Sequence, residues 1–175
     1  MVPCRVSFST PLLRIDMDAF TLDLATLPPG RSSVEVQARA EELELDPAAW
    51  EGPIRGLLTV EKSGEQVTVR GQLDAVALQE CVRCLEPARH EMHVPFEVFA
   101  ERSGGRRASQ EADLERDDYM KFHDGRRLDL REDARETLLL EMPMVPRCRP
   151  DCLGLCPRCG ADLNQGPCEC TPDAV

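Results

Sequence analysis

The sequence predicts an α+β protein, in which an antiparallel β-sheet is followed by one helix and a cysteine-rich module near the C-terminus. Three observations support this class. Apolar residues alternate with polar ones in several runs, one apolar stretch has helical spacing, and nine cysteines occur in 175 residues. Alternation predicts strands with one buried face. Such a sheet is either open or barrel-like, and the sequence does not distinguish between the two arrangements.

The composition predicts a folded core with a metal-stabilised appendage. Hydrophobic residues make up 42% of the chain but aromatic residues only 4%, so Val, Leu and Ala build the core. We expect a sheet domain over residues 1–146 and a cysteine-rich module over residues 147–175, packed on that domain. Residues 1–30 contain short apolar stretches and end at Pro28, Pro29 and Gly30, a turn signal. Beyond packing, no role can be assigned to them.

Four alternating runs predict the strands of the sheet. They span residues 34–40, 54–60, 67–75 and 92–98. A short link containing Ser63 and Gly64 separates the second run from the third, so these two should form an antiparallel hairpin. Cys81 and Cys84 then lie in the connection between the third and fourth strands.

A hydrophilic stretch and then a helix follow the strands. Residues 102–118 combine glycine, serine and mixed charges, which predicts a mobile loop. The helix is expected near residues 130–141, with Asp129 and Glu132 as a capping box. Pro143 ends it.

The cysteine spacing predicts zinc sites. Cys81 and Cys84 form one CxxC motif, and six more cysteines follow at Cys148, Cys152, Cys156, Cys159, Cys168 and Cys170. Structural zinc is bound by four thiolates about 2.3 Å away, and closely spaced pairs supply them. We expect two structural zinc ions, with one as the minimum.

Two divisions of the eight cysteines are open. In the favoured division Cys156, Cys159, Cys168 and Cys170 form a local knuckle, because closing short loops loses less entropy. The remaining four, Cys81, Cys84, Cys148 and Cys152, then join the sheet to the segment after the helix. The rival division groups residues 148, 152, 156 and 159 on one ion and residues 81, 84, 168 and 170 on the other. Cys4 is interpreted as a plain thiol.

The alternatives to structural zinc have weaker support. Thiol oxidoreductases place CxxC at the start of a helix after a strand, whereas strands flank Cys81 and Cys84. His90 and His93 lie near this pair but are interpreted as surface histidines. All-cysteine sites are closed, and no phosphate-binding loop, GxSxG or HExxH motif occurs. We therefore expect no enzymatic activity and no small-molecule substrate.

The net charge and the lack of targeting patterns indicate which kinds of partner to expect. The formal net charge is -11, which opposes broad nucleic-acid binding and favours a basic protein partner. Direct RNA contact through Arg147, Arg149 and Arg158 remains an alternative. The sequence has neither a long apolar window nor a signal-peptide pattern, so we expect a cytoplasmic protein with no membrane partner. Thiols stay reduced in that compartment.

Several segments together resemble the bacterial YceD family, which also has plastid relatives. They are CVRCL at 81–85, MPMVP at 142–146, CLGLCPRCG at 152–160, Leu163-Asn164 and Cys168-Glu169-Cys170. The resemblance covers roughly residues 54–170. It implies a non-enzymatic role in the accumulation or processing of 23S ribosomal RNA, through assembly of the large ribosomal subunit. Together with the charge, it predicts an acidic adaptor for basic ribosomal proteins or assembly factors.

Overall fold

The computed structural model describes residues 12–13, 20–103 and 120–170. This part of the chain is mostly β-sheet with one α-helix. Its elements in order are β1 (Leu12–Leu13), β2 (Thr21–Asp23), β3 (Gly30–Ala38), the 3-10 helices η1 (Ala40–Leu43) and η2 (Pro47–Ala49), β4 (Ile54–Ser63), β5 (Gln66–Glu80), β6 (Pro87–Arg102), β7 (Met120–His123), β8 (Arg127–Asp129) and α1 (Arg131–Leu140).

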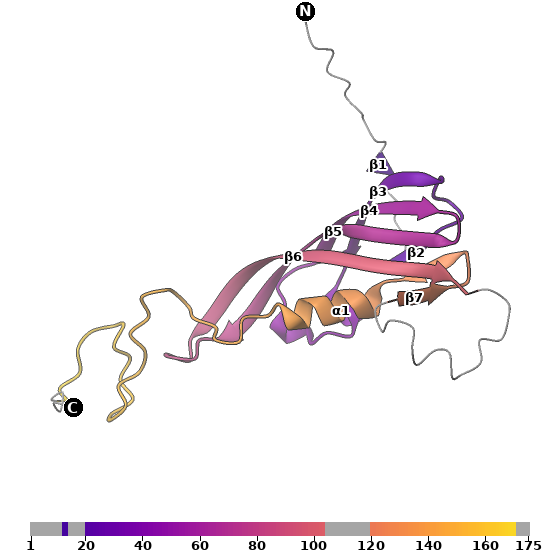
Figure 1. The fold of residues 1–175 in the computed structure, drawn as a ribbon. Helices are drawn as coiled ribbons and strands as arrows, with labels where there is room; N and C mark the ends of the chain where they lie inside the picture. Colours follow the sequence, from indigo (N-terminus) through magenta and orange to yellow (C-terminus); the bar gives the residue numbers. More distant parts are fainter. Residues whose placement is uncertain (1–11, 14–19, 104–119, 171–175) are drawn as a thin grey trace, which may run out of the picture.

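Six strands form one open sheet in the order β1-β3-β4-β5-β6-β7 (Figure 1). Strands β3, β4, β5 and β6 pair antiparallel with one another in sequence, which confirms the four predicted strands and the hairpin of β4 and β5. The short edge strands β1 and β7 run parallel to β3 and β6. Because β1 and β7 do not pair with each other, the described sheet is not closed, and the barrel-like alternative is wrong.

Alternation along the strands gives the sheet one buried face. Val34, Leu58, Val69 and Leu73 are among the fully buried side chains on this face. Helix α1 packs against it through Ala134 and Leu138, and the segment from Phe20 to Leu27 belongs to the same core. Each buried Leu or Val stabilises the fold by about 1.5–3 kcal/mol relative to an exposed one.

The residues after β1 have a structural role that the sequence did not indicate. Strand β2 pairs with β8 in a separate two-stranded sheet, and Lys62 on β4 donates hydrogen bonds to the carbonyls of Leu24 and Leu27 across 2.6 and 3.1 Å. Residues 1–11 and 14–19, and most of the predicted loop at 102–118, lie outside the described residues.

Helix α1 forms where it was predicted, but the expected capping box is wrong. The helix begins one residue later, so Leu130 is the N-cap and its side chain makes no capping hydrogen bond. Glu132 is therefore the second helical residue and not the third. Asp129 instead accepts a hydrogen bond from the backbone N–H of Arg131 at 3.0 Å. In chemical terms the carboxylate satisfies a free amide of the first turn, as an N-cap would.

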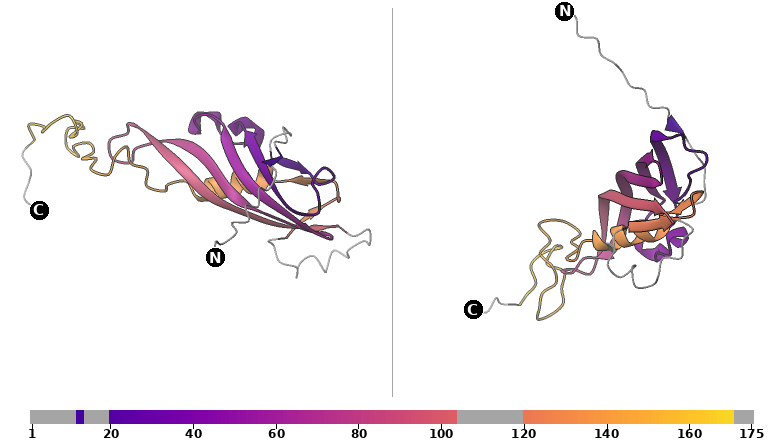
Figure 2. Two further views of the ribbon diagram at one scale, coloured as in Figure 1. Left: turned by 90° about the horizontal axis from the view of Figure 1, so that it is seen from above. Right: turned by 45° about the vertical axis from the view of Figure 1, so that its right-hand side comes forward.

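Strands β5 and β6 extend beyond the rest of the sheet and carry the cysteine sites. The pairing of β4 with β5 ends at Arg55 and Asp74, whereas β5 and β6 stay paired to Glu80 and Pro87. The far part of this hairpin is supported by Glu51, whose N–H donates to the carbonyl of Val76 at 2.9 Å. In Figure 2 the C-terminal segment continues beyond this end of the long strands. A two-stranded hairpin is only marginally stable in water, so its tip depends on other contacts.

Candidate metal centres

Cys81 and Cys84 lie in the tight turn that connects β5 to β6. The N–H of Cys81 donates to the carbonyl of Glu86 at 2.8 Å, and the N–H of Leu85 donates to the carbonyl of Cys81 at 2.9 Å. Leu85 closes the turn in the left-handed conformation, with φ of 62°. The turn therefore directs both sulfurs to one side.

The segment after α1 brings the next two cysteines to this turn. The side-chain amide of Gln79 donates to the carbonyl of Pro143 at 3.2 Å, and the N–H of Val82 donates to the carbonyl of Pro146 at 3.0 Å. These contacts hold the segment along the tip of the hairpin. Cys148 and Cys152 follow directly.

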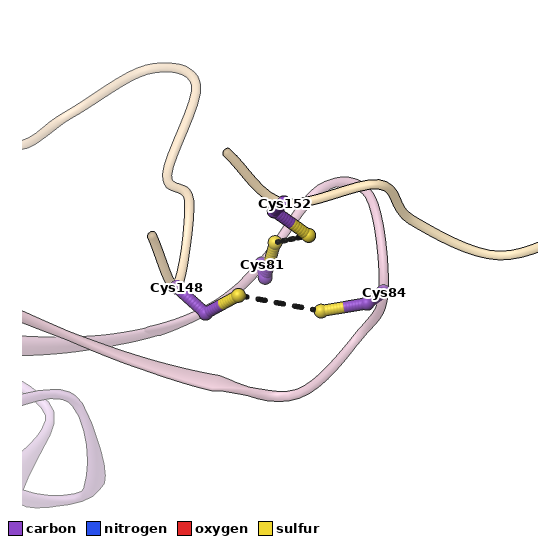
Figure 3. Close-up of side chains that lie close together, drawn as sticks. All are labelled: Cys81, Cys84, Cys148 and Cys152. Atoms are coloured by element: carbon purple, nitrogen blue, oxygen red, sulfur yellow. Dashed lines mark hydrogen bonds between the residues drawn. The ribbon is translucent and has the colours of Figure 1, made fainter. Parts of the chain in front are cut away.

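The four sulfurs of Cys81, Cys84, Cys148 and Cys152 form the first cluster (Figure 3). All four lie within 4.8 Å of one another. The Sγ atoms of Cys81 and Cys152 are 3.8 Å apart, and those of Cys84 and Cys148 are 3.5 Å apart. Four thiolates placed tetrahedrally at 2.3 Å from zinc would be about 3.8 Å apart. The first cluster thus has the geometry to hold a metal ion.

The second cluster consists of Cys156, Cys159, Cys168 and Cys170, whose sulfurs also lie within 4.8 Å of one another. Its first pair lies in a turn of the same kind, in which the N–H of Gly160 donates to the carbonyl of Cys156 at 2.9 Å. Gly160 has φ of 72°, so the left-handed position is here filled by the residue that adopts it without strain. Cys159 is exposed, whereas Cys81 and Cys152 of the first cluster are fully buried.

The structure thus brings the eight cysteines together in the favoured division. The rival division does not correspond to either cluster. Two groups of four cysteines have the geometry to hold a metal ion, and that they bind zinc remains a prediction. Cys4 lies outside the described residues.

Each cluster contains one thiol that ionises easily. Hydrogen bonds from the backbone amides of Cys148, Arg83 and Cys84 lower the pKa of Cys81 to about 6. Amides of Cys159 and Arg158 likewise lower the pKa of Cys156 to about 6. Burial, together with its hydrogen bond to Cys84, raises the pKa of Cys148 to about 12. Amides that stabilise a thiolate also stabilise a thiolate bound to metal, because the sulfur carries negative charge in both states.

Two side chains outside the clusters contact the first one. The amide of Asn164 donates from Nδ2 to the Sγ of Cys152 at 3.6 Å, and its Oδ1 accepts from the N–H of Leu153 at 2.8 Å. The guanidinium of Arg83 donates to the carbonyl of Cys152 at 2.5 Å. In the sequence Asn164 was noted only as part of the Leu163-Asn164 segment, and no local pattern indicated that it reaches Cys152.

The histidines lie apart from both clusters. His93 is exposed and its Nδ1 lies 2.6 Å from a carboxylate oxygen of Asp74. His90 belongs to neither group of cysteines. His123 on β7 is buried, and its Nδ1 accepts from the N–H of Gly125 at 2.9 Å.

None of the helices in the described part of the chain has the length and apolarity required to span a bilayer.

Comparison with known proteins shows that a family model matches this chain. The family model described as "Large ribosomal RNA subunit accumulation protein YceD" matches residues 69–175. The match includes all but the first three residues of the long hairpin, together with α1 and all eight clustered cysteines. No solved structure matches the chain.

Curated relatives are similar over part of their length. An uncharacterised protein of Mycobacterium tuberculosis is 37% identical over 111 residues, which cover 63% of this chain and 51% of that protein. One from Mycobacterium leprae is 34% identical over 69% of this chain and 54% of its own length. A chloroplastic protein of Zea mays, named as a YCED homolog for large ribosomal RNA subunit accumulation, is 26% identical over 82% of this chain and 60% of its own length. The chain thus spans a little over half the length of these relatives.

Proposed function

The chain belongs to the YceD family, and from this premise we propose that it supports the accumulation or processing of 23S ribosomal RNA during assembly of the large ribosomal subunit. In this proposal the protein is not an enzyme. It acts in the cytoplasm as an acidic adaptor that holds a basic ribosomal protein or assembly factor, and two zinc ions stabilise it. The family match over residues 69–175 is the observation that carries the ribosomal role, and the two groups of four cysteine sulfurs support the zinc ions.

Zinc suits the donor sets because all eight side chains are thiols. In each cluster four thiolates would fill the four positions of a zinc ion and leave none for water or substrate, so the metal would be architectural. Binding of structural zinc supplies about 10–16 kcal/mol of apparent free energy at neutral pH. This is enough to order a segment such as residues 141–170, which follows α1 and contains no helix and no strand.

The charge of the protein supports a basic partner. The formal net charge is -11, and two Cys4 zinc sites, each with four thiolates and one dication, bring it to about -15. Ribosomal proteins must neutralise RNA phosphates and are therefore rich in Lys and Arg. An acidic surface attracts such proteins, and this attraction weakens at high salt.

Direct RNA binding by the second cluster is the competing possibility, and the local contacts do not favour it. Arg149 lies 3.6 Å from the carboxylate of Asp151, so part of its charge is already compensated. Arg158 also has an interaction partner. Phosphate binding by Arg149 would have to displace Asp151, against the overall negative charge.

Two measurements test the proposed function. Cells that lack the protein should contain less 23S relative to 16S ribosomal RNA, and affinity capture from cells at low salt should recover basic proteins of the large subunit. Recovery should fall at moderate salt. Tight binding of purified protein to ribosomal RNA fragments at physiological salt, with no protein partner present, would contradict the adaptor role.

A further inference from the structure

The two CxxC turns differ at the residue that follows the second cysteine. Leu85 and Gly160 occupy the same place in their turns and both are left-handed, with φ of 62° and 72°. A residue with a Cβ is strained in this conformation, whereas Gly is not. The side chain of Leu85 is 61% exposed, so burial in the core of this chain does not compensate for the strain. Strained residues of this kind cluster at binding and switch sites.

Leu85 is part of a larger apolar surface around the first cluster. We use the name collar for five exposed side chains next to the four cysteines: Val82, Leu85, Met144, Val145 and Leu153. Hydrogen bonds join the three segments that carry them, since Val82 donates to Pro146 and Leu155 donates to Arg83. The five side chains of the collar therefore belong to segments that meet at the first cluster.

The second cluster has no such surface. Within the described residues 156–170 no large hydrophobic side chain is exposed. Exposed apolar side chains next to a closed metal site are thus not a requirement of the site itself. Contiguous exposed apolar surface on a soluble fold is typical of a binding site for another protein.

The charges beside the collar indicate which kind of protein it fits. Between Gln79 and Glu86 two carboxylates, Glu80 and Glu86, oppose the single guanidinium of Arg83. That guanidinium is engaged with the carbonyl of Cys152. Four thiolates on one zinc ion would add about two further negative charges. On the segment after α1, Arg147 and Arg149 are balanced in number by Glu141 and Asp151. The collar therefore lies in surroundings of net negative charge.

We propose that the collar is a docking surface for a segment of a basic large-subunit ribosomal protein or assembly factor that carries apolar side chains between Lys or Arg residues. Apolar side chains of the partner would pack on Leu85, Met144 and Leu153, and its cations would face Glu80, Glu86 and the cluster. This inference rests on the proposed function and assigns the partner to one place on the molecule.

Other occupants fit the collar less well. A second copy of this chain would bring two molecules of net charge -11 together, and like charges oppose association. Anionic lipid and RNA are disfavoured for the same reason. These occupants are distinguishable outcomes of the experiment below.

The experiment combines a crosslinker with a variant that leaves the fold intact. A photoreactive amino acid in place of Leu85 of the full chain should, in cells, form adducts that mass spectrometry identifies as basic large-subunit proteins. Leu85→Gly should keep both zinc ions and the melting temperature, because Gly adopts the turn without strain. Its capture of the same proteins should fall about tenfold or more.

Leu57→Ser is the matched control, since Leu57 is 57% exposed on the open face of β4, away from the clusters. Its capture should stay at the wild-type level. Adducts to a second copy of the chain, to RNA or to lipid would overturn the collar proposal, as would undiminished capture by Leu85→Gly. If the wild-type protein itself captures no large-subunit protein, the proposed function fails and the collar proposal fails with it.

Discussion

The side-chain amide of Asn164 donates a hydrogen bond to the Sγ of Cys152 across 3.6 Å, although Asn164 lies in the loop between the two cysteine pairs of the second cluster. The N–H of Leu163 in the same loop donates to the carbonyl of Gly154, two residues after Cys152, at 2.9 Å. The two clusters are thus adjacent parts of one structure.

Replacing Asn164 should therefore weaken metal binding at a site to which it contributes no ligand. Outer groups that donate to a metal-bound sulfur contribute about 10–100-fold to affinity. We expect Asn164→Ala to release one of two zinc ions to a chelator at a concentration about 10–100-fold lower than the wild type requires. Gln165→Ala serves as the control, because its amide contacts only the carboxylate of Asp162. Equal release from both variants would show that the contact to Cys152 contributes nothing.

Cys156→Ser should remove one zinc equivalent and leave the sheet folded. Serine is a poor zinc ligand, and the second cluster contributes no residue to the core of the sheet. Elemental analysis counts the metal and circular dichroism follows the sheet. Cys4→Ser, the control, should keep both ions. The division into two sites is contradicted if Cys156→Ser loses all of its metal or none.

Zinc retention should depend on pH. Metal binding requires deprotonated thiols, so protons compete with zinc as the pH falls. Backbone amides lower the pKa of Cys81 and Cys156 to about 6, below the ordinary 9.0, so these ligands stay ionised down to that pH and each cluster should release its ion below it.

Release of zinc from the loaded protein to a colorimetric chelator, followed from about pH 8 to about pH 4, measures the effect. Both ions still bound at about pH 4 would mean that protons do not compete for the sulfurs.

Gly71→Ala should destabilise the sheet more than its small size suggests. A Cβ at Gly71 would lie 2.2 Å from the backbone carbonyl oxygen of Leu57, so β4 and β5 would have to separate. We expect a loss of about 1–3 kcal/mol in the free energy of unfolding. Gln72→Ala, at the exposed neighbouring position, should change it by less than about 0.5 kcal/mol. Equal effects in urea unfolding would refute the close approach.

The long strands were predictable because their alternation is local. Val67 and Val69 on β5, like Val94 and Phe96 on β6, show the pattern in their own segments. The edge strands were not predictable in this way. Strand β1 has two residues and β7 has four, too few to show a period, and each is defined by its pairing with β3 or β6. The start of α1 was misplaced by one residue because the Asp129 carboxylate can accept a hydrogen bond from an N–H of the first turn whether it is the N-cap or the residue before it.

The grouping of the cysteines was predictable because short loops close more easily than long ones. Cys159 and Cys168 are separated by eight residues, and the remaining pairs then had to meet. Asn164 and Leu85 could not be identified in this way. The contact of Asn164 to Cys152 depends on how the two clusters lie together, and the left-handed backbone of Leu85 runs against the preference of its own side chain.

Metal content measured together with folding is the most direct test of the account. Protein purified under reducing conditions should contain two zinc ions per chain, and chelation should remove the hydrogen-exchange protection of residues 141–170 while the amides of β3 to β6 stay protected. Freshly purified, reduced protein that contains no metal and yet protects both regions would contradict the central claim.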